Sequence, residues 1–317
     1  MMKACVPRVA FGLAAAAAAA IACSLTTDLT GFSNGELPEV TPEAGGVDAS
    51  TDVALADATT DAPPPVCKPS TVIDSPFTAD LGTWSPRRVA QNDYPKVETF
   101  FGSTAAVLFP FVDTTPIPID AGDPDAGPEF FYPPERKSQA SALWQLTPVA
   151  LRSFDVDFEV QVRCTRSGSC ADGFAFAWIE TTSLSVLDNV ATGGAQGVPS
   201  GVNGAAVLLD DYQNEPSEIP DPAVPALEIV QLDPTKVPGS YAWHVTSKGA
   251  SFLGAWHALG VSVRGTAITV RFDGVAVLTS TVAARTKGLI GLTAGTGGQS
   301  DAVAVRNFKG SFYDCVP

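Results

Sequence analysis

Apolar and polar residues alternate strictly along residues 153–163, where aromatic and β-branched side chains are separated by charged or amide ones. A period of two is the pattern of a strand with one buried face and one polar face. Residues 205–209 show a second pattern, because they are apolar throughout. Such a run is typical of a strand covered on both faces, although a short buried helix has the same composition.

Further strand-like runs are closely spaced along the second half of the chain. They lie at residues 174–179, 227–232, 241–245, 259–263, 268–272, 275–278, 289–294 and 303–312. Turn-forming pairs such as Arg264-Gly265 and Asp273-Gly274 separate them. No stretch after the first 23 residues carries a helical stripe. Many short strands with Gly and Pro turns predict an all-β fold, a jelly-roll β-sandwich.

Residues 1–22 have the pattern of an export signal, with Lys3 and Arg8 ahead of a short apolar run. The run is too short to span a membrane. Ala20-Ile-Ala-Cys23 resembles a bacterial lipobox, which implies that Cys23 is lipid-modified and becomes the first residue of the mature protein. The alternative is plain secretion. Ser24 after the cysteine resembles outer-membrane sorting, so we expect an exported lipoprotein at the outer membrane or cell surface, attached to the membrane through its lipid alone.

Residues 23–66 are predicted to form a disordered acidic linker. Residues 24–66 hold eight Asp or Glu side chains and no Lys or Arg, among Ala, Thr, Pro and Gly. Such a segment buries too little apolar surface to become ordered. Residues 67–317 then form one folded domain with 17 basic and 26 acidic side chains, a charge of −9. A domain this acidic is a poor partner for nucleic acid. Within it, residues 113–134 are predicted to be a solvated Pro- and Asp-rich insertion.

Four cysteines remain in the predicted domain, and an even number in an exported protein predicts disulfides. Three connectivities are open. Cys164 and Cys170 flank a short turn-like loop, while Cys67 and Cys315 lie at the two ends of the domain. We therefore expect the pairs Cys164–Cys170 and Cys67–Cys315.

Oxygen-bearing side chains follow the apolar run at residues 205–209. Asp210, Asp211 and Asn214 lie within five residues, with Tyr212 between them. Carboxylate and amide oxygens are the ligands that calcium prefers. The alternative is an ordinary turn, because Asp and Asn side chains also bond to nearby backbone groups.

Four stretches, in the same order along the chain, resemble the L-type lectins, the concanavalin A-like family of legume lectins and animal cargo lectins. They are Ser141-Ala-Leu-Trp144 and the strand after it, Ala171-Asp-Gly-Phe-Ala-Phe176, Val207-Leu-Leu-Asp-Asp-Tyr-Gln-Asn214, and Gly291-Leu-Thr-Ala-Gly-Thr-Gly-Gly-Gln-Ser-Asp301. The resemblance implies a concanavalin A-like jelly-roll sandwich. The same superfamily contains glucanases, so the fold alone does not define the function.

The resemblance also implies a calcium site. Its ligands would be Asp210, the Tyr212 carbonyl, the Asn214 side chain and Asp221, with Asp233 as the substitute for Asp221. Legume lectins also bind a transition metal, with a Glu at the position of Leu208 and a His at that of Ala226. We therefore expect this chain to lack that second metal.

A sugar site next to the calcium is implied as well. Asp172 would supply the carboxylate, joined by Asn214 and by the loop residues Gly297, Gly298 and Gln299, because a pair of sugar hydroxyls needs an ionised acceptor with fixed donors around it. In this family the bound calcium holds the Asp172 loop in shape. The alternative for Asp172 is a turn residue before Gly173.

The leading functional interpretation is therefore a non-catalytic protein that binds a glycan or polysaccharide, with calcium as its cofactor. One alternative is an adhesion or scaffold module that has lost the sugar site. Another is a glycoside hydrolase, which would need two carboxyl groups about 5–5.5 Å apart for retaining chemistry. Glu228 and Asp233 are five residues apart and would fall on opposite faces of a strand, which argues against this enzyme.

Overall fold

A computed structural model of the 317-residue chain describes residues 67–89, 94–109, 138–164, 170–213, 224–235, 243–248, 252–297, 299 and 301–315. The predicted export signal, the linker and the 113–134 insertion lie outside these ranges. Within them, no helix has the length and apolar character needed to cross a bilayer. Both sheets of the fold belong to one unit, Pro63–Pro317.

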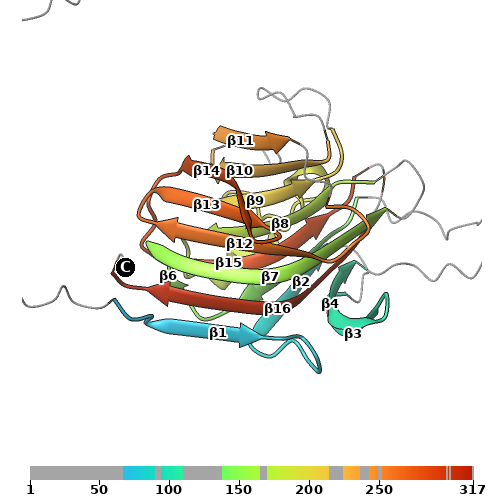
Figure 1. Cartoon of the computed structure of the whole chain (residues 1–317), viewed down its shortest axis with the longest axis horizontal. Coiled ribbons are helices and arrows are strands. Elements are labelled where there is room, and N and C mark those ends of the chain that lie inside the picture. The colour runs from blue at the N-terminus through green and yellow to red at the C-terminus, as the bar shows by residue number, and fades with distance from the viewer. Residues whose placement is uncertain are drawn as a thin grey trace, which may run out of the picture. The chain divides into compact units, whose positions relative to one another are not determined.

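Two antiparallel sheets, each of eight strands, stack face to face in this unit (Figure 1). We call them sheet A and sheet B. Sheet A has the order β14 (Val275–Thr281), β13 (Ala267–Phe272), β12 (His257–Arg264), β7 (Ser153–Cys164), β16 (Asp301–Tyr313), β4 (Ser103–Phe109) and β3 (Lys96–Phe100), and β1 (Thr71–Ser75) also pairs with β16. Sheet B has the order β11 (Trp243–Lys248), β10 (Ala226–Leu232), β9 (Gly204–Asp210), β8 (Gly173–Ile179), β15 (Lys287–Gly295), β5 (Ala140–Gln145) and β2 (Trp84–Val89), and β6 (Val149–Ala150) also pairs with β15. The prediction of an all-β concanavalin A-like sandwich is confirmed.

The main core fills the space between the two sheets. The alternating residues of β7 direct Phe154 and Phe158 inward, where their rings contact Phe176 of β8. Strand β16 supplies Phe308, stacked on Phe158 with ring centroids 5.9 Å apart. Alternation along β7 therefore places the polar side chains outward, as the sequence pattern predicts.

The outer face of sheet B is also buried, as the apolar run in β9 predicts. Two short 3-10 helices, η1 (Leu184–Asp188) and η2 (Gly193–Ala195), belong to the segment that lies against this face. Leu187 and Val198 of that segment pack with Ala206 and Leu208 of β9. Strand β9 is consequently buried along its whole length, so its C-terminal end emerges from a core on both sides.

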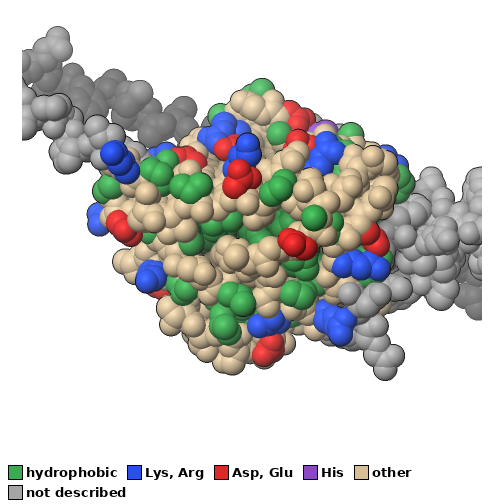
Figure 2. Space-filling model, turned by 90° about the horizontal axis from the view of Figure 1, so that it is seen from below, with side chains coloured by type: hydrophobic (Ala, Val, Ile, Leu, Met, Phe, Trp, Pro, Cys, Tyr) green, Lys and Arg blue, Asp and Glu red, His purple; other side chains and the backbone are tan. Residues whose placement is uncertain are grey.

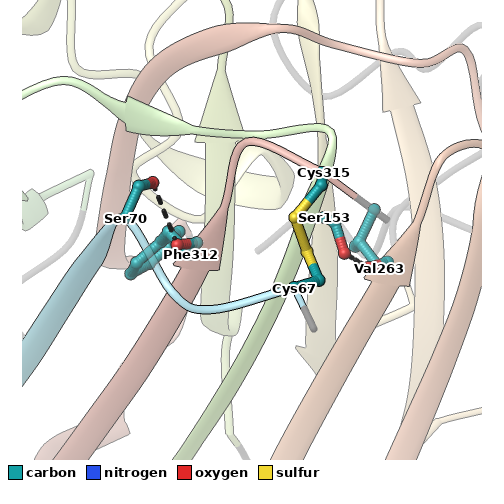
Figure 3. Close-up of a disulfide and its surroundings, with 6 residues drawn as sticks. All are labelled: Cys67, Ser70, Ser153, Val263, Phe312 and Cys315. Atoms are coloured by element: carbon teal, nitrogen blue, oxygen red, sulfur yellow. Dashed lines mark hydrogen bonds between the residues drawn. A yellow bond between two sulfur atoms is a disulfide. The ribbon is translucent and has the colours of Figure 1, made fainter. Parts of the chain in front are cut away.

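Both predicted disulfides are present. Cys67–Cys315 joins residues 248 positions apart, and Cys164–Cys170 closes a loop of six. Figure 3 shows the first bond beside the start of β1, where the Ser70 hydroxyl donates to the Phe312 carbonyl over 3.1 Å. The disulfide and this hydrogen bond fasten the N-terminal strand to the C-terminal one.

Charged side chains on the outer face of sheet A form ion pairs between strands. Arg264 binds Asp155 at 2.7 Å, and Arg306 binds Glu159. On the surface shown in Figure 2, basic and acidic side chains are likewise interspersed among polar and apolar atoms. The surface shown in Figure 2 carries no single basic patch of the kind that binds nucleic acid.

Candidate functional site

The strand register brings the candidate residues to one end of sheet B. Gly173, the first residue of β8, pairs with Asp210, the last residue of β9. On its other side Gly173 pairs with Gly295, the last residue of β15. Asp172, Asp210 and Gly297 therefore lie at three neighbouring strand ends.

Both main-chain polar groups of Asp172 are hydrogen-bonded. Its N–H donates to the Gly295 carbonyl over 2.9 Å, and its own carbonyl accepts from the side-chain amide of Gln196 at 2.9 Å. The peptide bond from Ala171 to Asp172 is cis. Asp172 itself is only 1% exposed, so its carboxylate lies within the protein and not on an open surface.

Gly297 lies directly against the Asp172 carboxylate. A Cβ placed on Gly297 would fall 2.8 Å from Asp172 Oδ2, closer than real Cβ contacts come. Any larger residue would have to displace the carboxylate. The structure thus brings together Asp172 and Gly297, two of the predicted sugar-site residues.

Asp210 lies at the predicted start of the calcium loop and is 4% exposed. Its Oδ1 accepts a hydrogen bond from the Tyr212 N–H at 3.1 Å, so the side chain folds the turn that follows β9. This contact is the turn geometry that the sequence offered as the alternative to metal binding. The carboxylate of Asp210 and the carbonyl of Tyr212 are oxygen ligands of the type that calcium takes.

A pair of buried carboxyl groups lies beside this loop. Asp211 is 7% and Asp301 2% exposed. Their four oxygens have no hydrogen-bond partner of ideal geometry, although the two carboxyl groups lie within reach of each other and Asp301 lies beside the Gly173 N–H. Burial, followed by the charge of Asp172, raises the pKa of Asp211 to about 8. Burial and the charges of Asp211 and Asp172 also raise the pKa of Asp301 well above its ordinary value. Without a cation, these two carboxyl groups therefore tend to hold protons, and a cation bound next to them would favour their ionised forms.

The structure describes only some of the remaining residues predicted for the calcium and sugar sites. Asn214, Asp221 and Gly298 lie outside the described residues, and Gln299 is partly exposed. Asp233, the substitute ligand, accepts from the Thr235 N–H and hydroxyl at 2.8 and 2.7 Å, which makes it a turn residue. Among the described side chains, no group of three or more Asp, Glu, His or Cys comes together as a metal centre.

The positions of the legume transition-metal ligands are apolar in this chain. Leu208 and Ala226 are buried on β9 and β10. Leu208 pairs with Glu228, a carboxyl group that is also buried. Glu228 lies within β10 and Asp233 beyond its end, so the structure does not present them as a pair on one strand.

Sequence reasoning missed Asp301 and Gln196. Asp301 starts β16 and has the same parity as Val303 and Val305, two residues of the core between the sheets. That parity could have placed Asp301 in the interior. Gln196 follows η2 in a left-handed conformation, and nothing in its local sequence indicates a contact with Asp172.

Comparisons with known proteins agree with this architecture. Residues 129–233 match the model of the legume-like lectin family. The exoplasmic/lumenal domain of VIP36, in a Ca2+/Man3GlcNAc-bound form, aligns with a TM-score of 0.53 and 17% identity, over 76% of this chain and 87% of that one. Lectin I-B4 from Griffonia simplicifolia, in a metal-free form, aligns with a TM-score of 0.52 and 18% identity, over 76% and 99%. No curated protein sequence matches the chain.

The basic winged bean lectin with Tn-antigen aligns with a TM-score of 0.50 and 12% identity, over 76% of this chain and 97% of that one. These similarities define the class of the sandwich, which has the concanavalin A-like fold of L-type lectins. At identities below 20% they establish the architecture, and the function has to be argued from the site.

Proposed function

We propose that this chain is an exported, non-catalytic lectin that binds a glycan in the presence of calcium. The observation that carries the proposal is the meeting of Asp172, Asp210 and Gly297 at one end of sheet B. These residues come from separate parts of the sequence. The family match over residues 129–233 supports carbohydrate binding as the general role.

In the proposed site, calcium is held by Asp210, the Tyr212 carbonyl, Asn214 and Asp221. Oxygen donors of this kind suit a hard cation, and the buried acids nearby favour positive charge. The bound ion would supply positive charge and fix the loop after β9. The Asp172 carboxylate would accept hydrogen bonds from sugar hydroxyls, with Asn214, Gly298 and Gln299 completing the site beside Gly297.

The burial of Asp172 favours a second candidate, an adhesion or scaffold module without a working sugar site. At 1% exposure, the carboxylate is reached by a hydroxyl group only after the adjoining loops move. A module that uses its outer faces for protein contacts would need no such movement. Glycan binding by the intact protein separates the two candidates.

We do not propose catalysis. A retaining glycosidase holds its two carboxyl groups about 5–5.5 Å apart on either side of the scissile bond. The two neighbouring carboxyl groups described above, Asp211 and Asp301, lie beside the loop that follows β9. Both are buried, so they do not flank an open cleft in which a scissile bond could lie.

The calcium part of the proposal is tested by thermal unfolding of the intact protein. An ion that binds only the folded state at a hundred times its dissociation constant should raise stability by about 2.7 kcal/mol. Asp210→Ala should remove this gain. Asp80→Ala is the matched control, because Asp80 also accepts from a backbone N–H two residues on, at 2.9 Å, but in an exposed turn away from the site. An Asp210→Ala protein with the full calcium response would exclude the proposed ligand.

A further inference from the structure

The backbone of Asp172 belongs to a closed ring of contacts that contains no metal ligand. The Asp172 N–H donates to Gly295 of β15, and its carbonyl accepts from Gln196. The carbonyl of Gln196 accepts in turn from the Thr293 hydroxyl of β15 at 2.7 Å. The ring therefore runs from β15 through Asp172 and Gln196 and back to β15.

The orientation of the Gln196 amide follows from its partner. The Asp172 carbonyl is an acceptor only, so the Gln196 nitrogen has to face it. This leaves Gln196 Oε1 buried without a hydrogen-bond partner. A buried acceptor without a partner is unfavourable, so the bond from the nitrogen to the Asp172 carbonyl determines the orientation of this amide.

Gln196 also has an unfavourable backbone conformation. Its φ of 48° and ψ of 40° lie in the left-handed region, which side-chain-bearing residues seldom occupy. The conformation is fixed from both sides, because Gln196 N–H donates to Gly193 at 2.8 Å and a Cβ on Gly295 would fall 2.8 Å from the Gln196 Cα. Strained, over-determined residues of this kind gather at functional sites.

We propose that Gln196 is a positioning residue which fixes the Asp172 main chain from the β15 side, opposite the calcium loop, so that the backbone carrying the sugar-binding carboxylate is fixed before any metal binds. This inference rests on the proposed sugar-binding role of Asp172. It changes the role of calcium, because the ion then completes the site at Asp210 and Tyr212 and is not needed to shape the Asp172 loop.

The test is hydrogen exchange at the Asp172 amide, measured on the intact protein in EDTA without any glycan. The wild-type amide should be as well protected as those of β8. Gln196→Met keeps the chain length and the Thr293 contact but removes the donor, and should speed exchange at Asp172 about tenfold, the usual effect of one hydrogen bond. Gln145→Met is the matched control, since Gln145 is a buried glutamine (4% exposed) whose amide donates to Thr83 at 2.7 Å elsewhere on sheet B.

A second variant covers the case in which Gln196→Met does not fold. Thr293→Val preserves the side-chain shape, removes the hydroxyl that holds the Gln196 carbonyl, and should speed the same amide by a smaller factor. Fast exchange of the wild-type amide in EDTA that slows only with calcium would overturn the proposal, as would unchanged exchange in either variant. A wild-type protein that binds no glycan would refute the sugar-binding proposal, and the exchange result would still decide the role of Gln196.

Discussion

At the scale of single residues, the most unusual feature is the pair of interior carboxyl groups, Asp211 and Asp301. Two ionised carboxylates accept hydrogen bonds and donate none, so they can bond to each other only when one holds a proton. Burial strengthens their repulsion because the local dielectric is low. Without calcium, this pair should make the protein sensitive to pH.

The direction of that sensitivity follows from the raised pKa values. The folded chain binds more protons than the unfolded chain between about pH 4 and the raised pKa of Asp211, about 8. The free energy of unfolding should therefore fall as the pH rises through this window. Asp301→Asn provides a donor for Asp211 and should flatten the slope, with a gain of about 1–2 kcal/mol at pH 8.

Denaturant unfolding in EDTA at pH 5 and pH 8 measures this effect. Asp80→Asn is the control, because Asn forms the same exposed turn and leaves the interior charges untouched. If the wild-type protein is more stable at pH 8 than at pH 5, the proposed electrostatics of the pair are wrong.

The conformation and position of a residue could be predicted where the neighbouring sequence determines them. The Asp273-Gly274 turn has φ values of 49° and 81°, the left-handed pair that this dipeptide favours between strands. The position of Asp210 at a strand end followed from the apolar run before it. Gln196 was not predictable, because its role depends on a contact with Asp172 across 24 positions of sequence.

At the scale of elements, the N-terminal strand β1 depends on β16 for its place. It is a five-residue edge strand whose backbone pairs with the C-terminal half of β16, with Ile73 buried in the main core and the Ser75 hydroxyl accepting from the Trp84 indole N–H at 2.9 Å. Short edge strands with few contacts are the first elements to separate. The Cys67–Cys315 disulfide lies next to the pairing of β1 with β16 and therefore limits the separation of these two strands.

The two disulfides should therefore differ in their contribution to stability. In the chain-entropy model, a bond across 248 positions stabilises by about 5 kcal/mol and one across six by about 2 kcal/mol. Replacing Cys67 and Cys315 by Ser should lower the unfolding free energy more than replacing Cys164 and Cys170. Denaturant midpoints of the two double variants measure the difference, and an equal loss would contradict the role given to the long disulfide.

Strands were predicted best where apolar and polar residues alternate along them or where all their residues are apolar. Strands β7 to β10 and β12 to β16 lie within a few residues of their predicted positions. The strands β1 to β4 were not predicted. The apolar run at the end of β4 was a strand signal that sequence reasoning missed, whereas β1 and β2 mix polar residues and Pro86 with few apolar ones. Such strands are defined by pairing with partners far away in sequence, which local periodicity does not reveal.

At the scale of the whole molecule, the sequence predicts an export signal and an acidic linker ahead of the sandwich. Disulfides are typical of proteins outside the reducing cytosol, which agrees with export. We propose that Cys23 carries the lipid that holds the sandwich at the outer membrane or cell surface. A linker rich in acidic residues and Pro would keep the domain away from the anionic surface.

The anchor is tested by Cys23→Ser. Because one residue is proposed to carry the whole attachment, this variant should move from the membrane fraction to the soluble exported fraction. Cys5→Ser, within the predicted signal, is the control and should leave fractionation unchanged. A Cys23→Ser protein that stays in the membrane fraction would refute lipid attachment at this residue.

The most direct test of the whole account is binding of the intact protein to a broad glycan array, in calcium and in EDTA. We expect binding to a restricted set of glycans in calcium and its loss in EDTA. Asp172→Asn should keep the calcium-dependent stabilisation but bind none of these glycans, because its carboxylate is proposed to face the sugar and not the ion. If the wild-type protein is stabilised by calcium yet binds no glycan, the lectin proposal is wrong and the scaffold alternative takes its place.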